Sequence, residues 1–225
     1  MLKAGANVRK RVLEPEEYLV LKKNLDKHQK VLCKLALCSR MPLGEVIPIK
    51  KSNKEEGTRG LIWDRVDFKN RMILFEAEDT KTGEARQIPI TDEIKEVFNS
   101  ISRDISCNYV FTYPGVPLSN IRGGVNRACS DAQMAFGMKA KGRFVFWDLS
   151  TTTDTLMARG GVQEVYRRAL LAHNKRMDRH YVHPDFEKDL RAVMEKYTCW
   201  LGVELEAAKQ SVDQTVDQEG NWWSW

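Results

Sequence analysis

The side chains best suited to chemistry gather in residues 144–183, which read FVFWDLSTTTDTLMARGGVQEVYRRALLAHNKRMDRHYVH. Near the end of this stretch His180 and His183 form a His-x-x-His pair, and Asp185 follows. Such a pair can ligate zinc, but a stable site needs three or four ligands around the ion. Two histidines and one acid near a helix end are weak evidence for such a site, so we expect no metal ion and no cofactor.

Two helices are predicted at the start of the chain. Glu14, Pro15 and the acids that follow are typical of a helix start, because proline suits the first turn and negative side chains complement the positive end of a helix. An apolar stripe within residues 18–25 supports this helix. Residues 31–38 are apolar on most sides, which predicts a second and central helix.

The hydrophobic pattern changes from helical to alternating between residues 66 and 90. Strands are predicted at residues 72–75 and 85–90, and the turn between them places Lys81 at the tip of a β-hairpin. A helix over residues 91–100 follows, with Thr91 as its N-cap. These elements combine helices with a small antiparallel sheet.

The composition indicates an intracellular protein with a substantial core. Apolar residues make up 42% of the 225, which is enough to bury a core without disulfides. The five cysteines form no Cys-x-x-Cys pair and lie in apolar segments, so we expect them to be reduced core residues. The sequence has no apolar run of membrane-spanning length and its first residues lack the apolar region of a signal peptide. We therefore expect a cytoplasmic protein without a membrane partner.

The charge is distributed unevenly along the chain. Residues 201–225 hold five acids and one lysine, which leaves 35 basic and 26 acidic residues, a net charge of +9, in the first 200. A positive excess of this kind suits a phosphate-rich partner. The basic residues expected to contact its phosphates are Arg9, Lys10, Arg11, Lys81, Lys141, Arg143, Lys175 and Arg176.

Residues 144–183 resemble the catalytic half of the tyrosine recombinases, the phage integrase family. In that family an aromatic strand end runs into His-Asp-Leu-Arg-His, and Leu-Leu-Gly-His follows about nine residues before the nucleophilic tyrosine. Here Trp147-Asp148-Leu149-Ser150-Thr151 fills the first slot and Leu170-Leu171-Ala172-His173 the second. Tyr181 follows His173 by eight residues, one fewer than usual. The resemblance implies that Tyr181 is the nucleophile and that Trp147 and Ser150 replace a histidine and an arginine.

The first half of the chain extends the resemblance. Ser39-Arg40-Met41-Pro42-Leu43-Gly44-Glu45 stands where the family has Thr-Gly-Met-Arg-x-Gly-Glu, so Pro42 takes the place of the first catalytic arginine. Residues 60–67 match a later family phrase, and residues 47–59 are predicted to be an inserted loop. Arg59 in this loop is one candidate substitute for the missing arginine, although a loop arginine is more often merely solvated.

Two further phrases resemble the family. Lys-Thr-Gly at residues 81–83 is among its more specific signals, which implies that Lys81 is the general acid that protonates the leaving group. Exposed hairpins also favour lysine and glycine for ordinary reasons. Tyr109-Val110-Phe111 resembles a family strand that precedes a helix, expected here at residues 121–134.

The chemical groups implied by the resemblance are thus only partly present. Three positions retain the family residue, namely Lys81, His173 and Tyr181. Three others have lost an arginine, a histidine and an arginine, namely Pro42, Trp147 and Ser150. Removing one preorganised group that stabilises transition-state charge typically costs about a hundred- to a thousandfold in rate. The loss of three is therefore expected to abolish efficient turnover.

Trp147 is expected to fill the hollow that the lost histidine and arginine would keep polar. An indole has a single N–H donor and gains free energy when its ring is buried. We therefore predict that Trp147 lies in the core beside His173. Cations borrowed from Arg40, Lys141 or Arg143 are the alternative that would sustain weak activity.

The resemblance implies an α+β, mainly α fold: an integrase-type catalytic domain, a helical bundle with a small antiparallel β-sheet. Three parts are expected along the chain. Residues 1–13 form a basic arm, residues 14–200 the integrase-like domain with its inserted loop at about 47–59, and residues 201–225 an acidic C-terminal tail. Three tryptophans lie in this tail, at positions 222, 223 and 225.

The leading interpretation is a DNA-binding relative of the tyrosine recombinases that is catalytically inactive or severely impaired. One alternative is a weakly active site-specific recombinase with Tyr181 as its nucleophile. Another is a protein-interaction module that acts through the C-terminal tail. That tail also offers a route to contacts with recombinase subunits or with a second copy of the chain.

Overall fold

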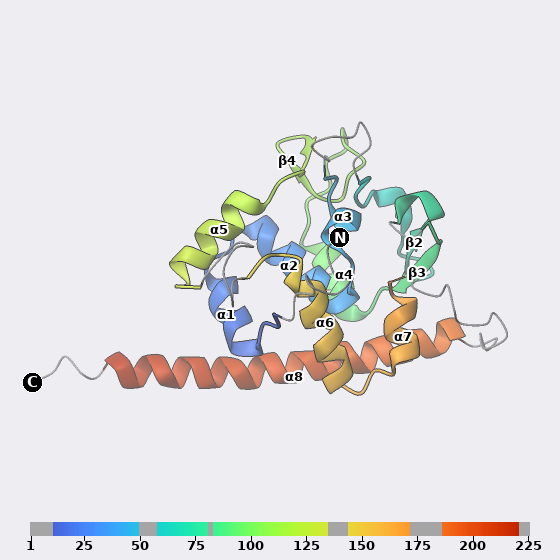
Figure 1. Ribbon diagram of the computed structural model, residues 1–225. Coiled ribbons are helices and arrows are strands. Elements are labelled where there is room, and N and C mark those ends of the chain that lie inside the picture. The colour runs from blue at the N-terminus through green and yellow to red at the C-terminus, as the bar shows by residue number, and fades with distance from the viewer. Residues whose placement is uncertain (1–10, 50–57, 81–82, 135–143, 172–185, 221–225) are drawn as a thin grey trace, which may run out of the picture.

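The computed structural model describes residues 11–49, 58–80, 83–134, 144–171 and 186–220, and of residues 215–220 only the backbone. The described elements are mostly helices, with a small antiparallel sheet, which confirms the mainly helical α+β class. Figure 1 shows one long helix, α8 (Phe186–Gly220), running beneath the other elements across the width of the molecule.

The first two helices form around capping interactions. Helix α1 (Pro15–Asn24) begins where expected, with Glu14 and Glu17 in a capping box. Helix α2 (Lys27–Ser39) begins four residues earlier than predicted, because Asp26 accepts a hydrogen bond from the Gln29 N–H at 2.8 Å. The central place predicted for α2 is confirmed by its buried residues, which include Leu32, Cys33, Leu35, Ala36, Leu37 and Cys38.

The predicted hairpin is present within a three-stranded antiparallel sheet of order β1-β2-β3. A short 3-10 turn, η1 (Trp63–Arg65), leads into β1 (Val66–Asp67), which pairs with β2 (Met72–Phe75). Strand β3 (Arg86–Pro89) pairs with β2 so that Ile73 lies opposite Ile88. A second 3-10 turn, η2 (Ala77–Asp79), follows β2. The base of the turn to β3 is fixed by the Glu84 N–H, which donates to the Thr80 hydroxyl at 3.1 Å.

The segment after the sheet differs in part from the prediction. Helix α4 (Asp92–Asn99) has Thr91 as its N-cap, as expected. The strand expected at residues 109–111 is wrong, because only Tyr109 takes part in a β-bridge, with Ile62. The backbone is still hydrogen-bonded: the Val110 N–H donates to the Leu61 carbonyl at 3.0 Å, and the Phe111 carbonyl accepts from the Leu118 N–H at 2.9 Å. The short hairpin of β4 (Thr112–Tyr113) and β5 (Val116–Pro117) follows, and then α5 (Arg122–Asp131).

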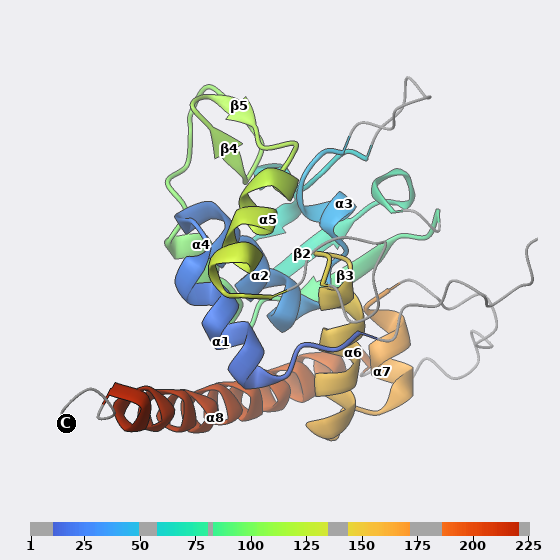
Figure 2. The same cartoon turned by 60° about the vertical axis from the view of Figure 1, so that its left-hand side comes forward.

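The last three helices lie together on one side of the molecule (Figure 2). Helix α6 (Asp148–Arg159) packs on α2, where the Thr153 hydroxyl donates to the Ala36 carbonyl at 3.1 Å. Helix α7 (Glu164–Ala169) follows it. At the end of α6, Gly160 lies directly on the Trp200 ring of α8, since a Cβ there would approach the ring to 2.8 Å. Only glycine permits this close approach of the two helices.

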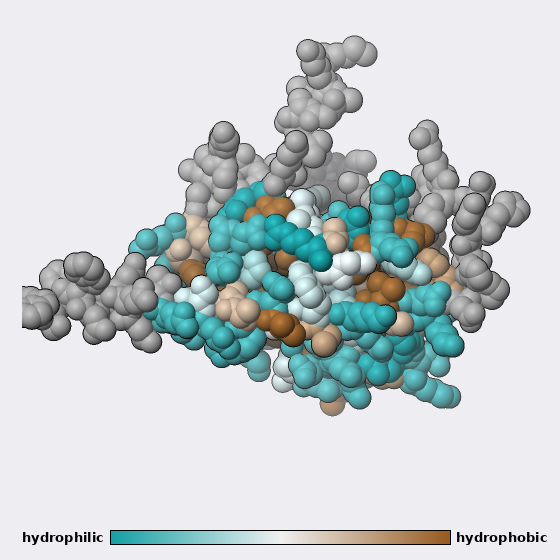
Figure 3. Space-filling view, turned by 90° about the horizontal axis from the view of Figure 1, so that it is seen from below, coloured by the Kyte–Doolittle hydropathy of each residue, from teal (hydrophilic) through white to brown (hydrophobic). Residues whose placement is uncertain are grey.

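Helix α8 passes through the expected boundary at residue 200 without a break. Leu201 and Ala208 beyond that point are still buried, and Asp213 forms an ion pair with Lys23 of α1 at 3.6 Å. The outer face of the molecule on this side is mostly hydrophilic, with hydrophobic residues scattered singly (Figure 3). The three tryptophans of the tail lie outside the described residues.

The cysteines are divided between the core and the surface. Cys33, Cys38 and Cys129 are buried as expected, and burial raises the pKa of the Cys38 thiol to about 12, which keeps it protonated and unreactive. Cys199 on α8 is exposed and Cys107 half-buried, so the expectation of a core position is wrong for these two. Among the helices of the described residues, none has the length and apolar character that crossing a membrane requires.

Candidate functional site

The N-terminal turn of α6 carries the two substituted positions Trp147 and Ser150. The aromatic residues that lead into it are Phe144 and Phe146, both buried, whereas Trp147 is 68% exposed. The buried Asp148 carboxylate accepts a hydrogen bond from the Val145 N–H at 2.8 Å and so fixes the turn. The prediction that Trp147 is buried is therefore wrong. The two phenylalanines supply the buried rings of this turn, and the indole at the N-cap position points to solvent.

An arginine cluster lies farther along α6. Ser150 is half-buried, and Asp154 follows it by one helical turn. Asp154 Oδ1 lies 2.7 Å from Nη2 of Arg40 and 2.7 Å from Nη1 of Arg167. One carboxylate thus binds two guanidinium groups, and we call these three residues the Asp154 cluster. Its net charge is +1.

Arg40 belongs to this cluster and is not a free cation. The residue caps the C-terminus of α2 with φ 62° and is 8% exposed. Its Nη1 also donates to the Arg167 carbonyl. The pKa of Arg40 is lowered to about 10, mainly by burial. The nearby charges of Arg167 and Arg86 also lower this pKa, whereas the Asp154 carboxylate opposes the shift. Its guanidinium is therefore still charged at neutral pH, and that charge is bound to Asp154.

A buried ion pair stands beside the place of the first lost arginine. Pro42 is the N-cap of the short helix α3 (Leu43–Val46), and Glu45 in this helix binds Arg86 of β3. The two side chains are 7% and 5% exposed. Burial raises the pKa of Glu45 to about 7, although Arg86 opposes the shift. The pair joins α3 to β3 and so holds the hairpin that leads to Lys81.

Most of the predicted site lies outside the described residues. This applies to the retained positions Lys81, His173 and Tyr181, to the predicted DNA contacts Arg9, Lys10, Lys141, Arg143, Lys175 and Arg176, and to His180, His183 and Asp185. Within the described part of the chain, no group of three or more histidines, cysteines and acids is arranged to hold a metal ion.

Besides Arg40, two arginines singled out in the sequence are described, and both form ion pairs. Arg11 binds Glu17 of α1 with an N–O distance of 2.5 Å and donates to the Val12 carbonyl at 2.7 Å. It therefore anchors the N-terminal segment to α1. Arg59 pairs with Glu78 at 2.6 Å, and both side chains are 58% exposed. This is the solvated position that is ordinary for a loop arginine.

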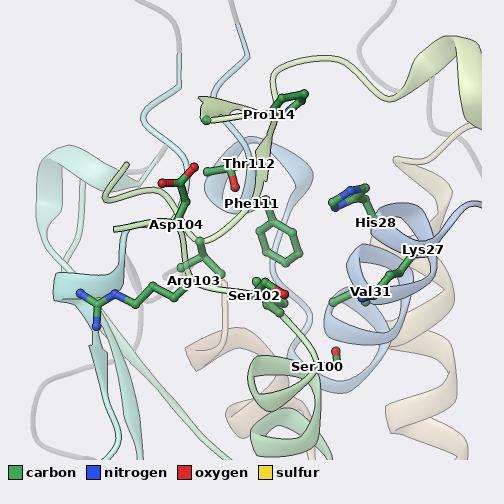
Figure 4. Close-up of a pocket in the computed structure, with 13 residues that line it drawn as sticks. Lys27, His28, Val31, Ser100, Ser102, Arg103, Asp104, Phe111, Thr112 and Pro114 are labelled. Atoms are coloured by element: carbon green, nitrogen blue, oxygen red, sulfur yellow. The ribbon is translucent and has the colours of Figure 1, made fainter. Parts of the chain in front are cut away.

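A hollow of about 360 Å³ opens elsewhere on the surface, between the start of α2, the segment after α4, and β4 (Figure 4). Lys27 and His28 border it, and Phe111 contributes an apolar wall. Arg103 also borders it, but its guanidinium lies over the Trp63 ring, 5.4 Å from the centroid. The three lost positions Pro42, Trp147 and Ser150 are described, and none of them lines this hollow.

Sequence reasoning named Arg40 as a possible cation, but it missed Arg86, Arg167 and both ion-paired groups. Arg86 does have a signal, because it alternates with Ile88 and Ile90 along one strand and so shares their inward face. Arg40 and Arg167 have no comparable pattern. They meet at Asp154 only when the end of α2 packs against α6 and α7, which are consecutive helices far from α2 in the sequence.

Comparison with solved structures finds the fold of integrase catalytic domains. The structure matches the lambda integrase catalytic core with a TM-score of 0.55 and 17% identity, over 73% of this chain and 96% of that chain. It also matches the integrase of transposon Tn1549 in complex with a circular intermediate DNA. That match has a TM-score of 0.56 and 18% identity, over 85% of this chain and 67% of that chain.

Comparison at the level of sequence finds less. No protein-family model matches this chain, and no curated protein is similar to it. The structural matches, at 17% and 18% identity, define the fold and leave the activity open.

Proposed function

We propose that this protein is a DNA-binding relative of the tyrosine recombinases whose strand-transfer activity is lost or severely impaired. The observation that supports impairment is the state of the cations around the substituted positions. Pro42, Trp147 and Ser150 supply no positive charge, and Arg40 and Arg86 are buried in ion pairs. A negatively charged pentavalent phosphorus needs cations that are preorganised and free to contact it.

Binding to double-stranded DNA is supported by fold and charge. The matched Tn1549 integrase is in complex with DNA, and residues 1–200 of this chain carry a net charge of +9. We propose contacts mainly to phosphates, through the basic residues identified in the sequence, with weak dependence on base sequence. The proposal includes a cytoplasmic location, with contacts to recombinase subunits or to a second copy through the tail.

DNA binding and the formation of a covalent protein–DNA adduct are tested in one experiment. The full chain is mixed with a labelled duplex at two salt concentrations, and with a nicked suicide substrate that traps any phosphotyrosyl intermediate. We expect affinity to fall steeply as salt rises and no covalent adduct to form. A stable adduct contradicts impairment. Absence of binding at low salt contradicts DNA binding and favours the protein-interaction module.

A weakly active recombinase with Tyr181 as nucleophile is the second candidate. The exposure of Trp147 favours it, because the N-terminal turn of α6 stays open to solvent instead of being sealed into the core. If a trace of adduct forms, Tyr181→Phe must abolish it, while Tyr113→Phe, at an exposed tyrosine of β4, must leave it unchanged. An adduct that survives Tyr181→Phe rules this mechanism out.

A further inference from the structure

Trp147 is exposed in a way that the other tryptophans of the described residues are not. Trp63 is 8% exposed and Trp200 is half-buried against Gly160 at the end of α6 and Tyr197, whereas Trp147 is 68% exposed. Leaving most of an indole ring in water forgoes the free energy that its burial would release. An exposed indole at a site where the fold expects a nucleic acid is therefore a candidate for contact with the ligand.

The base beneath this ring is rigid. Phe144 and Phe146 are buried on either side of Val145, and the Val145 N–H is held by the Asp148 carboxylate. The Leu149 N–H donates to the Phe146 carbonyl at 3.1 Å, which closes the first turn of α6. The backbone that carries Trp147 is thus fixed before any ligand arrives, so binding orders only the two side-chain torsions of the indole.

The chemistry around Trp147 suits a nucleobase better than a phosphate. An indole offers a broad π-face and one N–H, on which a flat base can stack. Ser150, one turn later on the same face, adds a hydroxyl that can donate to or accept from a base or sugar. The Asp154 cluster, with its net charge of +1, lies one further turn along α6. In an intact duplex both faces of each base are covered by its neighbours, so an unpaired base is the fitting partner.

We infer that Trp147 stacks on an unpaired nucleobase of bound DNA, so that this protein prefers duplexes with a bulged base to fully paired ones. The inference rests on the proposed DNA binding and adds the class of DNA that the site selects. Trp147 thereby recognises a base that is no longer stacked in the DNA duplex, at a position where the resemblance implies a contact to phosphate.

The test compares two duplexes of the same sequence, one fully paired and one with a single bulged thymine, by fluorescence anisotropy with the full chain. We expect the wild type to bind the bulged duplex about ten times more tightly, because stacking on an aromatic side chain contributes a five- to roughly hundredfold effect per base. Trp147→Ala should lower the affinity for the bulged duplex to that for the paired one. Trp147→Phe should keep part of the preference.

The matched control is Tyr113→Ala, since Tyr113 is 63% exposed on the β4–β5 hairpin and should leave the preference intact. Unchanged thermal midpoints establish that the variants are folded. Equal binding of both duplexes by the wild type, or a preference that survives Trp147→Ala, overturns the inference while DNA binding stands. Failure to bind the paired duplex at low salt overturns the proposed function itself.

Discussion

The N-terminal turn of α6 and the buried ion pairs of the molecule differ in how they use charge. The N-terminal turn, with Trp147 and Ser150, faces solvent and carries no cation. The Asp154 cluster, farther along α6, and the Glu45–Arg86 pair between α3 and β3 hold three arginines in or near the core. Arginine is therefore abundant beside the substituted site, but it is used to hold helices and strands together. Proximity of a cation does not make it available for catalysis.

Energetics explain why the buried arginines cannot simply be released. A buried ion pair contributes little net stability, because desolvation offsets the attraction of the two charges. Removing one partner is costly, since the other charge stays buried without compensation. Substitution of a buried, ion-paired arginine should therefore lower the free energy of unfolding strongly. Substitution of the exposed Trp147 should lower it only weakly.

The largest effect is expected from Arg86→Ala. At pH 8, where Glu45 is ionised, the substitution should lower the free energy of unfolding by about 3–5 kcal/mol, because the Glu45 carboxylate is left buried and unpaired. Urea denaturation measures this loss. Arg159→Ala is the control: that arginine pairs with Glu14 at the surface, with side chains 47% and 46% exposed, and its loss should cost less than about 1 kcal/mol. Equal losses in the two variants contradict the distinction.

The next effect is a dependence of stability on pH. The pKa of Glu45 in the folded chain, about 7, lies above its ordinary value of 4.5, so the folded chain keeps a proton that the unfolded chain has lost. The contribution of Glu45 to the free energy of unfolding is therefore complete below about pH 4.5. It falls by roughly 3 kcal/mol as the pH rises to about 7. Denaturation across this range should show the decline in the wild type relative to Glu45→Gln, which cannot titrate. Parallel profiles for the two proteins rule out this assignment.

A smaller effect is expected when one cation is added to the exposed side. Ser150→Arg should strengthen binding to duplex DNA and steepen its salt dependence by about one unit of slope, because one more phosphate is contacted. It should still give no covalent adduct, since Pro42 and Trp147 supply no charge. Anisotropy at several salt concentrations and a suicide substrate measure the two properties. An adduct in this single variant means that the remaining groups suffice.

The smallest effect is expected from Trp147→Ala. A side chain that is 68% exposed should contribute less than about 0.5 kcal/mol to stability. Trp63→Ala is the matched variant, and it should cost about 3–5 kcal/mol because Trp63 is 8% exposed. Thermal or denaturant unfolding of the two separates them. A large loss for Trp147→Ala would mean that the ring is covered in solution.

The elements of this fold were predictable where the signal is local. Proline and acids marked the start of α1, Thr91 marked the start of α4, and alternation marked the β2–β3 hairpin. Helix α2 begins at Lys27 because Asp26 is its N-cap, whereas the apolar pattern that predicts the helix begins only at Val31.

The direction of side chains was harder to predict, because it depends on packing. Trp147 was expected to be buried on the basis of its size, but Phe144 and Phe146 supply the buried rings of that turn. Similarly, Arg40 and Asp154 are 114 positions apart in the sequence, and the residues around neither of them predict their contact. Fold class follows from periodicity and motif order, whereas the pairing of buried charges follows from the assembled tertiary structure.

One contact has a consequence for the order in which the chain folds during synthesis. The Leu37 carbonyl lies in the last turn of α2, where no helical N–H reaches it, and it accepts a hydrogen bond from the buried hydroxyl of Tyr197 at 2.9 Å. The ribosome makes Tyr197 160 residues after Leu37. Until α8 emerges, the Leu37 carbonyl is hydrated and the side of α1 that α8 covers is exposed. The nascent chain should therefore remain open to proteases and chaperones, and become compact only when α8 docks.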